Sequence, residues 1–247
     1  MEAAIQIVDL ENPRVKKVVG DILSQSITGE LIGMSNFASL AETIDDYSEK
    51  MEAVEHAESE RQHAIGFISI ADQYNLPKVI NVNGTYWNSI RQRFLHYARS
   101  GDFIACLIIQ EVMLESFAVS MYRDTGRAIG GDIGDLLLRT SAEEMDHLEH
   151  CTEILQNELA ASPEAFTAKF HQLHDEVMTI LCEFSANSDH REHCGVCNGN
   201  CMKDDLMEIG LTTSQLRGNA LRLYAEALDR IGIPSEQSTI WMLNLPA

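Results

Sequence analysis

Two short motifs constrain this chain more than any other feature of its sequence. They are Glu60-Arg61-Gln62-His63 and Glu144-Met145-Asp146-His147, the only places where a glutamate precedes a histidine by three residues. On a helix, that spacing puts a carboxylate and an imidazole on one face, one turn apart, where both can bind the same metal ion. Two such pairs predict a dinuclear metal site.

Each motif follows, at nearly the same interval, a glutamate in an apolar helical stripe. Glu30 comes thirty residues before Glu60, and Glu115 comes twenty-nine residues before Glu144. In ferritin-like di-iron and di-manganese bundles, two helices contribute one glutamate each and the other two contribute Glu-x-x-His. The repeat therefore favours such a bundle over the alternative, two solvated helix faces.

The two single glutamates have competitors. Glu30 could lie at the wet edge of its stripe, and Glu111 lies one turn before Glu115 in the same apolar helix. A buried acid is costly unless it is paired, protonated or bound to metal. The interval to Glu144 favours Glu115 as the ligand. His56 and His150, each one turn from a motif, are interpreted as surface or supporting histidines.

The charge excludes some classes of protein. Eighteen basic and thirty-eight acidic side chains give a net charge of -20, which repels nucleic acid and anionic membranes at long range. Residues 1–20 lack the apolar core of a secretory signal, and the longest apolar run, Phe103–Ile109, is far shorter than a membrane span. We expect a cytoplasmic protein without nucleic-acid binding or a membrane span.

The apolar periodicity predicts an all-α fold, a ferritin-like four-helix bundle with additional helices, formed by residues 1–247 as a single domain. The expected helices cover Val15–Ile44, Tyr47–Tyr74, Thr85–Arg99, Phe103–Tyr122, Asp132–Leu159, Pro163–Phe184 and Leu206–Ile231. Tyr86, Trp87 and Phe94 in the third helix are interpreted as core residues, with pocket lining as the alternative.

A Cys/His-rich insertion at about 188–203 interrupts this pattern. Cys194, Cys197 and Cys201 follow the spacing C-x-x-C-x-x-x-C, and His190 and His193 precede them. Three thiolates and one histidine suit a tetrahedral zinc site. Free or redox-active thiols and an incidental loop remain open alternatives.

The chain resembles the cyanobacterial aldehyde-deformylating oxygenases, also called aldehyde decarbonylases. The resemblance covers residues 26–155 and rests on Gly29-Glu30, on Glu60-Arg61-Gln62-His63 with Gly66-Phe67, on Cys106 to Gln110, on Glu115 with Phe117-Ala118 and Tyr122, and on Glu144 with His147. It implies six metal ligands, Glu30, Glu60, His63, Glu115, Glu144 and His147, and a pocket near Phe37, Phe67, Tyr86, Gln110 and Tyr122.

The resemblance also implies a reaction. Two Fe ions, with Mn possible, would use O2 and external electrons to convert a fatty aldehyde to formate and an alkane or alkene one carbon shorter. An electron donor such as ferredoxin would be required. Because the chain is strongly acidic, an acidic donor would need a local basic patch, which Arg91, Arg93 and Arg99 could form.

Several positions depart from the family. Phe37 replaces a tyrosine, Tyr86 and Trp87 replace two phenylalanines, Ile70 replaces a cysteine, and the segment His190–Cys201 has no counterpart. Two alternatives therefore stay open. One is a different di-iron oxygenase or N-oxygenase acting on a more polar metabolite, and the other is a non-catalytic iron-binding bundle.

Overall fold

The computed structural model describes residues 7–186, 196–197 and 201–246. Its regular elements, within these ranges, are all helical. In chain order they are α1 (Pro13–Ala41), α2 (Tyr47–Gln73), α3 (Thr85–Arg99), α4 (Phe103–Leu107), the π-helical segment η1 (Ile108–Leu114), α5 (Glu115–Ile129), α6 (Gly131–Ala161), α7 (Pro163–Leu173), the π-helical segment η2 (His174–Met178), α8 (Thr179–Ala186), α9 (Met202–Asp205), the 3-10 segment η3 (Leu206–Ile209), α10 (Thr213–Ile231) and α11 (Ser235–Leu243).

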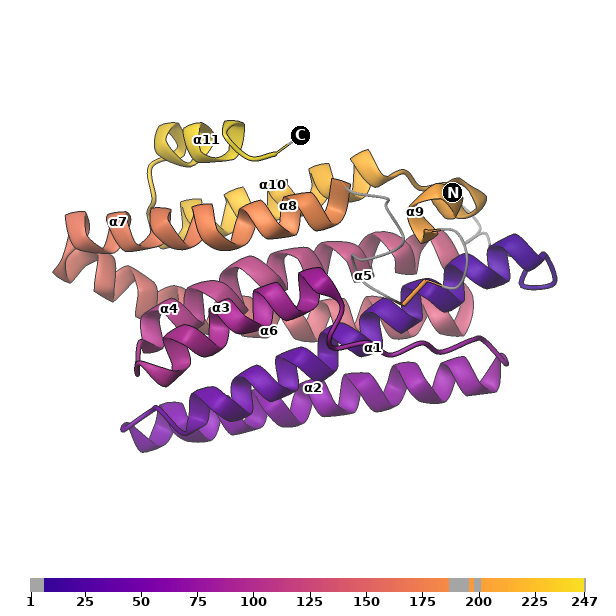
Figure 1. Ribbon diagram of the computed structural model, residues 1–247, viewed down its shortest axis with the longest axis horizontal. Coiled ribbons are helices and arrows are strands. Elements are labelled where there is room, and N and C mark those ends of the chain that lie inside the picture. Colours follow the sequence, from indigo (N-terminus) through magenta and orange to yellow (C-terminus); the bar gives the residue numbers. More distant parts are fainter. Residues whose placement is uncertain (1–6, 187–195, 198–200, 247) are drawn as a thin grey trace, which may run out of the picture.

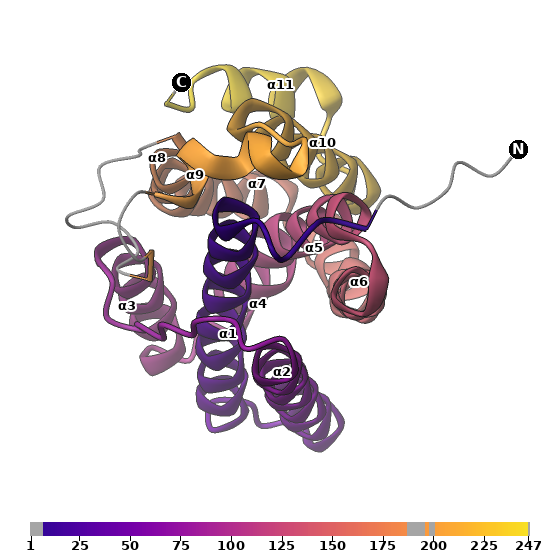
Figure 2. The same ribbon diagram turned by 90° about the vertical axis from the view of Figure 1, so that its right-hand side faces the viewer.

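The central unit is a bundle of four long rods. Helix α1 packs along α2, and α5 packs along α6 (Figure 1). The end view in Figure 2 shows α3 on one side of these rods, with α7, α8, α10 and α11 covering another side. The predicted all-α bundle with additional helices is confirmed.

Local sequence signals set the ends of the long helices. The side chain of Asn12 accepts a hydrogen bond from the Arg14 amide at the start of α1, and Asp46 accepts bonds from the amides of Ser48 and Glu49 at the start of α2. Such caps satisfy amides that lack partners within the helix. Helix α2 ends just before Leu76-Pro77, as the sequence predicts.

Three predicted helices differ from the structure. The apolar helix continues beyond Tyr122 to Ile129 and contains η1, and the sixth predicted helix contains η2. The predicted helix Leu206–Ile231 is broken at Gly210, whose φ of 74° is left-handed. Helix α11 was not predicted. The segments η1 and η2 are local changes of helical period that apolar spacing does not reveal, whereas the break at Gly210 comes from its left-handed backbone.

The apolar rod Phe103–Ile129 is long enough to cross a membrane, which the shorter run Phe103–Ile109 did not suggest. However, 72% of its most apolar window is buried inside the protein. Core helices of bundles meet the same criteria of length and composition, and here the rod packs against α6 and α10.

Two apolar clusters lie at different heights in the bundle. On α1, one cluster uses residues between Val15 and Ile27, and the other begins at Phe37. On α6, the first includes Ile133 and Leu137, and the second begins at Leu148. The predicted metal ligands lie between the two clusters on each of these helices. A polar layer thus crosses the middle of an otherwise apolar core.

The approach of α5 to α6 depends on Gly134. A Cβ atom at this position would lie 2.4 Å from the carbonyl oxygen of Gly126, and a backbone atom cannot move aside easily. We expect Gly134→Ala to destabilise the protein by about 1–3 kcal/mol, as in other overpacked cores. Urea denaturation of the two proteins measures this change.

Gly218→Ala in α10 is the matched control, because a Cβ there meets open space. It should stabilise the helix by up to about 1 kcal/mol through helix propensity. Equal effects of the two substitutions would contradict the close-packing explanation.

Candidate metal centre

The six predicted ligands meet in the polar layer. Glu30 lies on α1, Glu60 and His63 on α2, Glu115 at the start of α5, and Glu144 and His147 on α6. Each has an exposed fraction of 5% or less. They form two overlapping groups, Glu30, Glu60, His63 and Glu144, and Glu60, Glu115, Glu144 and His147, in each of which the ligand atoms lie within 4.8 Å of one another.

Glu144 is the centre of this arrangement. Its Oε1 lies 2.9 Å from Nδ1 of His63, and its Oε2 lies 2.8 Å from Nδ1 of His147. Nδ1 of His63 is also 3.2 Å from Oε2 of Glu30, and Nδ1 of His147 is 3.7 Å from Oε1 of Glu60. Only Glu60 and Glu144 belong to both groups. If two ions were bound, these two carboxylates would be the ones available to both.

The π-helical segment η1 separates Glu111 from Glu115. In a regular α-helix, residues four apart share a face, whereas the wider π turn aligns residues five apart. Accordingly, Nε2 of Gln110 donates a 2.8 Å hydrogen bond to Oε1 of Glu115. Glu115 joins the six-residue site, and Glu111 joins a separate group with His56 and His150.

The donor atoms of the site suit a metal. Oε1 of Glu60, Oε2 of Glu144 and Nδ1 of His147 are fully buried and form no well-oriented hydrogen bond with a described residue, although the last two atoms lie 2.8 Å apart. An unsatisfied buried polar atom costs about 1–3 kcal/mol. Here the three atoms face one another, so a cation between them would satisfy all three. Four carboxylates with two imidazoles form a set typical of iron or manganese sites.

Other side chains hold the ligands in place. The Tyr122 hydroxyl donates to Oε1 of Glu30, and Nδ2 of Asn36 donates to Oε1 of Gln110 at 2.8 Å. Nε2 of His63 lies 2.8 Å from Oε2 of Glu143, so a neutral His63 that binds metal through Nδ1 can donate to this carboxylate. Such partners orient metal-binding histidines. Sequence analysis missed Asn36 and Glu143, because neither has a characteristic spacing from the motifs.

The metal-free site retains protons. Burial raises the pKa of Glu60, and repulsion from Glu144 and Glu30 raises it further. Burial alone would lower the pKa of His63, but contacts with the carboxylates of Glu144 and Glu30 raise it to about 11. Burial would raise the pKa of Glu144, yet the imidazoles of His147 and His63 lower it to about 2. The charge of Glu144 is thus balanced by protons on its neighbours.

An apolar cavity opens onto the carboxylates. Its volume is about 150 Å³. Its wall includes the four glutamates of the site together with Gln110 and Tyr122. The rest of its wall is mainly apolar, from Ile22, Gly29, Ile32, Trp87, Leu114, Phe117, Ala118, Met121, Leu181, Phe184, Cys197, Cys201 and Met202, with Gln25, Ser26, Gly33, Ser185 and Lys203.

The predicted pocket residues are placed unequally. Gln110 and Tyr122 line the cavity, whereas Phe37, Phe67 and Tyr86 are not part of its wall. The ring of Phe37 packs edge-on against His147 at 5.6 Å, and Phe67 packs against Tyr122 at 5.4 Å. Both phenylalanines support site residues from behind.

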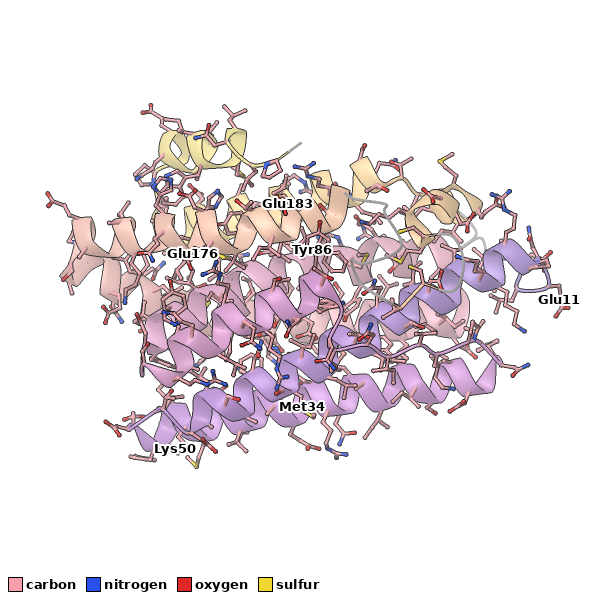
Figure 3. The ribbon with its side chains drawn as sticks, in the orientation of Figure 1. Glu11, Met34, Lys50, Tyr86, Glu176 and Glu183 are labelled. Carbon is pink, nitrogen blue, oxygen red and sulfur yellow. The ribbon has the colours of Figure 1, made fainter. Side chains whose placement is uncertain are left out.

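Helix α3 reaches the cavity through Trp87 instead of Tyr86. Figure 3 labels Tyr86 where α3 lies beside α8, and its ring stacks on Phe184 at 5.4 Å. Trp87 lines the cavity, and its Nε1 donates to Oε1 of Gln25 at 2.9 Å. Trp87 is thus a wall residue of the cavity, the position that sequence analysis gave as the alternative to the core.

The predicted zinc site lies largely outside the described residues, because His190, His193 and Cys194 belong to the undescribed part. Cys197 and Cys201 are described and line the cavity. The Met202 amide donates to Sγ of Cys197 at 3.5 Å. Zinc binding by this segment stays a prediction, and so does its status as an insertion in a single domain.

Gly33 makes room for Glu60. A Cβ at Gly33 would lie 2.8 Å from the carboxylate of Glu60. We expect Gly33→Ala to displace this carboxylate and to lower metal affinity by roughly 10- to 100-fold, the range found when groups that orient ligands are removed. Competition with a chelator of known affinity measures the loss.

Gly29→Ala, one turn earlier on α1, is the matched control. Its Cβ would meet the Trp87 ring at 3.4 Å, an ordinary contact. Both substitutions add helix propensity, so the control should fold equally well and keep its metal affinity. Unchanged affinity in Gly33→Ala would refute the assignment of Glu60 as a ligand.

Metal binding should release protons. His63, whose pKa is raised to about 11, is protonated at lower pH, and a protonated imidazole cannot bind metal. Apparent metal affinity should therefore rise with pH throughout the range below that pKa. Calorimetric titration in two buffers of different ionisation enthalpy counts the released protons. Identical heats in both buffers would contradict the proton balance described above.

Comparison with known proteins identifies a family and a fold. The family model described as long-chain fatty aldehyde decarbonylase matches residues 14–190. A solved structure of a Synechococcus protein, described as having aldehyde deformylating oxidase activity, aligns with a TM-score of 0.77 at 17% identity, over 96% of this chain and 99% of that one. The structural match confirms the predicted ferritin-like fold. The chain belongs to the long-chain fatty aldehyde decarbonylase family.

Proposed function

We propose that the protein is an O2-dependent di-iron enzyme that converts a fatty aldehyde to formate and an alkane or alkene one carbon shorter. The observation that carries this proposal is the mainly apolar cavity whose wall includes the four buried glutamates. An aliphatic tail fits the apolar wall, and an aldehyde group at its end would lie at the metal site. Family membership supports the same substrate class.

The residues suggest how two ions would be held. Glu30 and His63 would bind one ion and Glu115 and His147 the other, with Glu60 and Glu144 shared, because this division follows the two overlapping groups. Carboxylate-rich sets with one imidazole per ion favour iron or manganese over copper or zinc. In its reduced form, a di-iron centre of this kind supplies the activation of dioxygen.

Gln110 and Tyr122, which line the cavity beside the glutamates, would orient the aldehyde. Gln110 is fixed between Asn36 and Glu115 by hydrogen bonds of 2.8 Å at each end. Burial, together with the charges of Glu30 and Glu144, raises the pKa of Tyr122 well above its ordinary value. Tyr122 therefore keeps its proton at neutral pH and can hold it beside the reacting atoms.

The reaction needs electrons from outside. Cleaving RCHO to RH and formic acid with one O2, while the remaining oxygen atom becomes water, takes four electrons and four protons. A ferredoxin-like donor is the proposed source. On α3, Arg93 has a side chain that is 52% exposed, and Arg99 is exposed, whereas Arg91 donates to Ser35 Oγ at 3.0 Å. These arginines form the proposed docking patch.

The two alternatives fit the site less well. An iron-storage bundle has no use for an apolar cavity whose wall includes its ligands. A polar metabolite would leave its own polar groups without partners along the apolar wall, which costs free energy. The cavity therefore favours the aldehyde, and the substrate screen below includes amines to test the N-oxygenase alternative.

The test uses protein loaded anaerobically with Fe(II), then given O2, a chemical reductant and, in separate reactions, a long-chain aldehyde or a long-chain amine. Alkane and formate should form in equal amounts. Glu60→Gln should abolish both products, because it removes a shared ligand. Ala118→Phe, one turn from Glu115 in the cavity wall, should reduce turnover of long aldehydes more than of short ones at unchanged iron content.

Oxygen consumption without alkane, together with product from an amine, would replace aldehyde deformylation with N-oxygenation. Iron binding without turnover of either substrate would support the non-catalytic bundle. An Ala118→Phe variant that loses activity equally at all chain lengths would show that the cavity does not bind the substrate tail.

A further inference from the structure

A second cluster of ligand-type side chains lies beside the dinuclear site. His56 precedes Glu60 by one turn on α2, Glu111 precedes Glu115 in η1, and His150 follows His147 by one turn on α6. One ligand atom from each of the three residues lies within 4.8 Å of the others. Three rods of the bundle thus carry a second residue of a metal-binding type, about one turn from their ligand in the first site.

The Glu111 carboxylate lies between the two imidazoles. Its Oε2 is 3.0 Å from Nδ1 of His150, and its Oε1 is 3.6 Å from Nδ1 of His56. Glu111 is only 1% exposed and His56 only 7%. Nδ1 of His56 has no hydrogen-bond partner among the described residues, although it points at this carboxylate. This buried nitrogen is an independent sign that a ligand is missing.

The far sides of both imidazoles face a second pair of acids. Nε2 of His56 is 3.4 Å from Oε1 of Glu52, and Nε2 of His150 is 3.5 Å from Oε2 of Glu49. Histidines that bind metal through one nitrogen usually direct the other ring N–H to a carboxylate or carbonyl, which fixes the tautomer. A metal bound at Nδ1 of each histidine would leave the ring proton on Nε2, toward these acids. Without metal, Nδ1 of His150 instead donates a hydrogen bond to Oε2 of Glu111 at 3.0 Å.

We propose that His56, Glu111 and His150 form a third metal site for a divalent transition ion. Two imidazoles and one carboxylate, with open positions, are a ligand set typical of Fe(II) and also of zinc. The site abuts the dinuclear one, since the rings of His56 and His147 lie 4.2 Å apart between centroids. A cation here would also compensate the buried charge of Glu111.

A metal-free network is the competing explanation. If both histidines were protonated, they would neutralise Glu111 without any ion. The two explanations differ in the number of ions bound, and that number does not depend on catalytic activity. A metal count therefore decides between them even if the proposed reaction is wrong.

The test equilibrates the full chain anaerobically with excess Co2+, removes unbound ion by gel filtration, and measures metal per chain together with the visible Co2+ absorption. The wild type should bind three ions. Glu111→Gln and His150→Gln should each bind two and lose the same part of the absorption. His150 is partly exposed, with 21% of its side chain accessible, so this variant should fold even if Glu111→Gln does not.

His171→Gln is the matched control, because Nε2 of His171 also faces an acid, Oδ1 of Asp175 at 3.7 Å. His171 is far in sequence from the residues of both sites. It should keep three ions. In Glu60→Gln, the absorption that Glu111→Gln loses should persist, which separates the third site from the dinuclear one.

Two results would overturn the proposal. One is a wild type that binds two ions with Glu111→Gln unchanged. The other is a count of three that neither Glu111→Gln nor His150→Gln lowers. A third result would refute the dinuclear assignment alone: a wild type that binds one ion per chain, and a Glu111→Gln variant that binds none.

Discussion

The structure depends on burying four carboxylates in the middle of an apolar bundle. Charge in such an environment is costly unless it is neutralised and its lone pairs are satisfied. Without metal, protons on His63 and on the flanking acids provide that compensation. Two divalent cations would provide it with ligand geometry already in place. Features of the surrounding bundle hold these acids close together. Gly33 on α1 leaves room for the carboxylate of Glu60, and Gln110 in η1 donates a hydrogen bond to Glu115.

The fold and the site differ in how much the sequence reveals of them. Glu60, His63, Glu144 and His147 were predictable because they lie in uninterrupted α-helices, where a spacing of three places side chains on one face. Glu115 was chosen over Glu111 only by its interval to Glu144. The physical reason for their separation is the π-helical segment η1, and apolar periodicity does not distinguish a π turn from an α turn.

The cavity was harder to predict because its wall comes from distant parts of the chain. Gly29 on α1, Trp87 on α3 and Phe184 on α8 meet only after the outer helices pack. Apolar residues on these helices look alike in sequence whether they face a core or a cavity. The resemblance to the family implied Phe37, Phe67 and Tyr86 as pocket residues, whereas Trp87, Cys197 and Cys201 line the cavity.

The cluster of His56, Glu111 and His150 follows from the same geometry that builds the dinuclear site. In a bundle, each turn of a helix directs side chains into one layer of the core, and the next turn directs side chains into the neighbouring layer. Metal-binding residues at adjacent turns of several helices therefore form adjacent sites. In this chain three rods carry such residues one turn from the first site, while α1 presents Phe37, whose ring packs on both His56 and His147. Because α1 contributes the apolar ring of Phe37 there and no ligand, the cluster of His56, Glu111 and His150 has fewer ligands than the dinuclear site. Glu111, almost fully buried, therefore depends on the charge of the two histidines or of a bound cation.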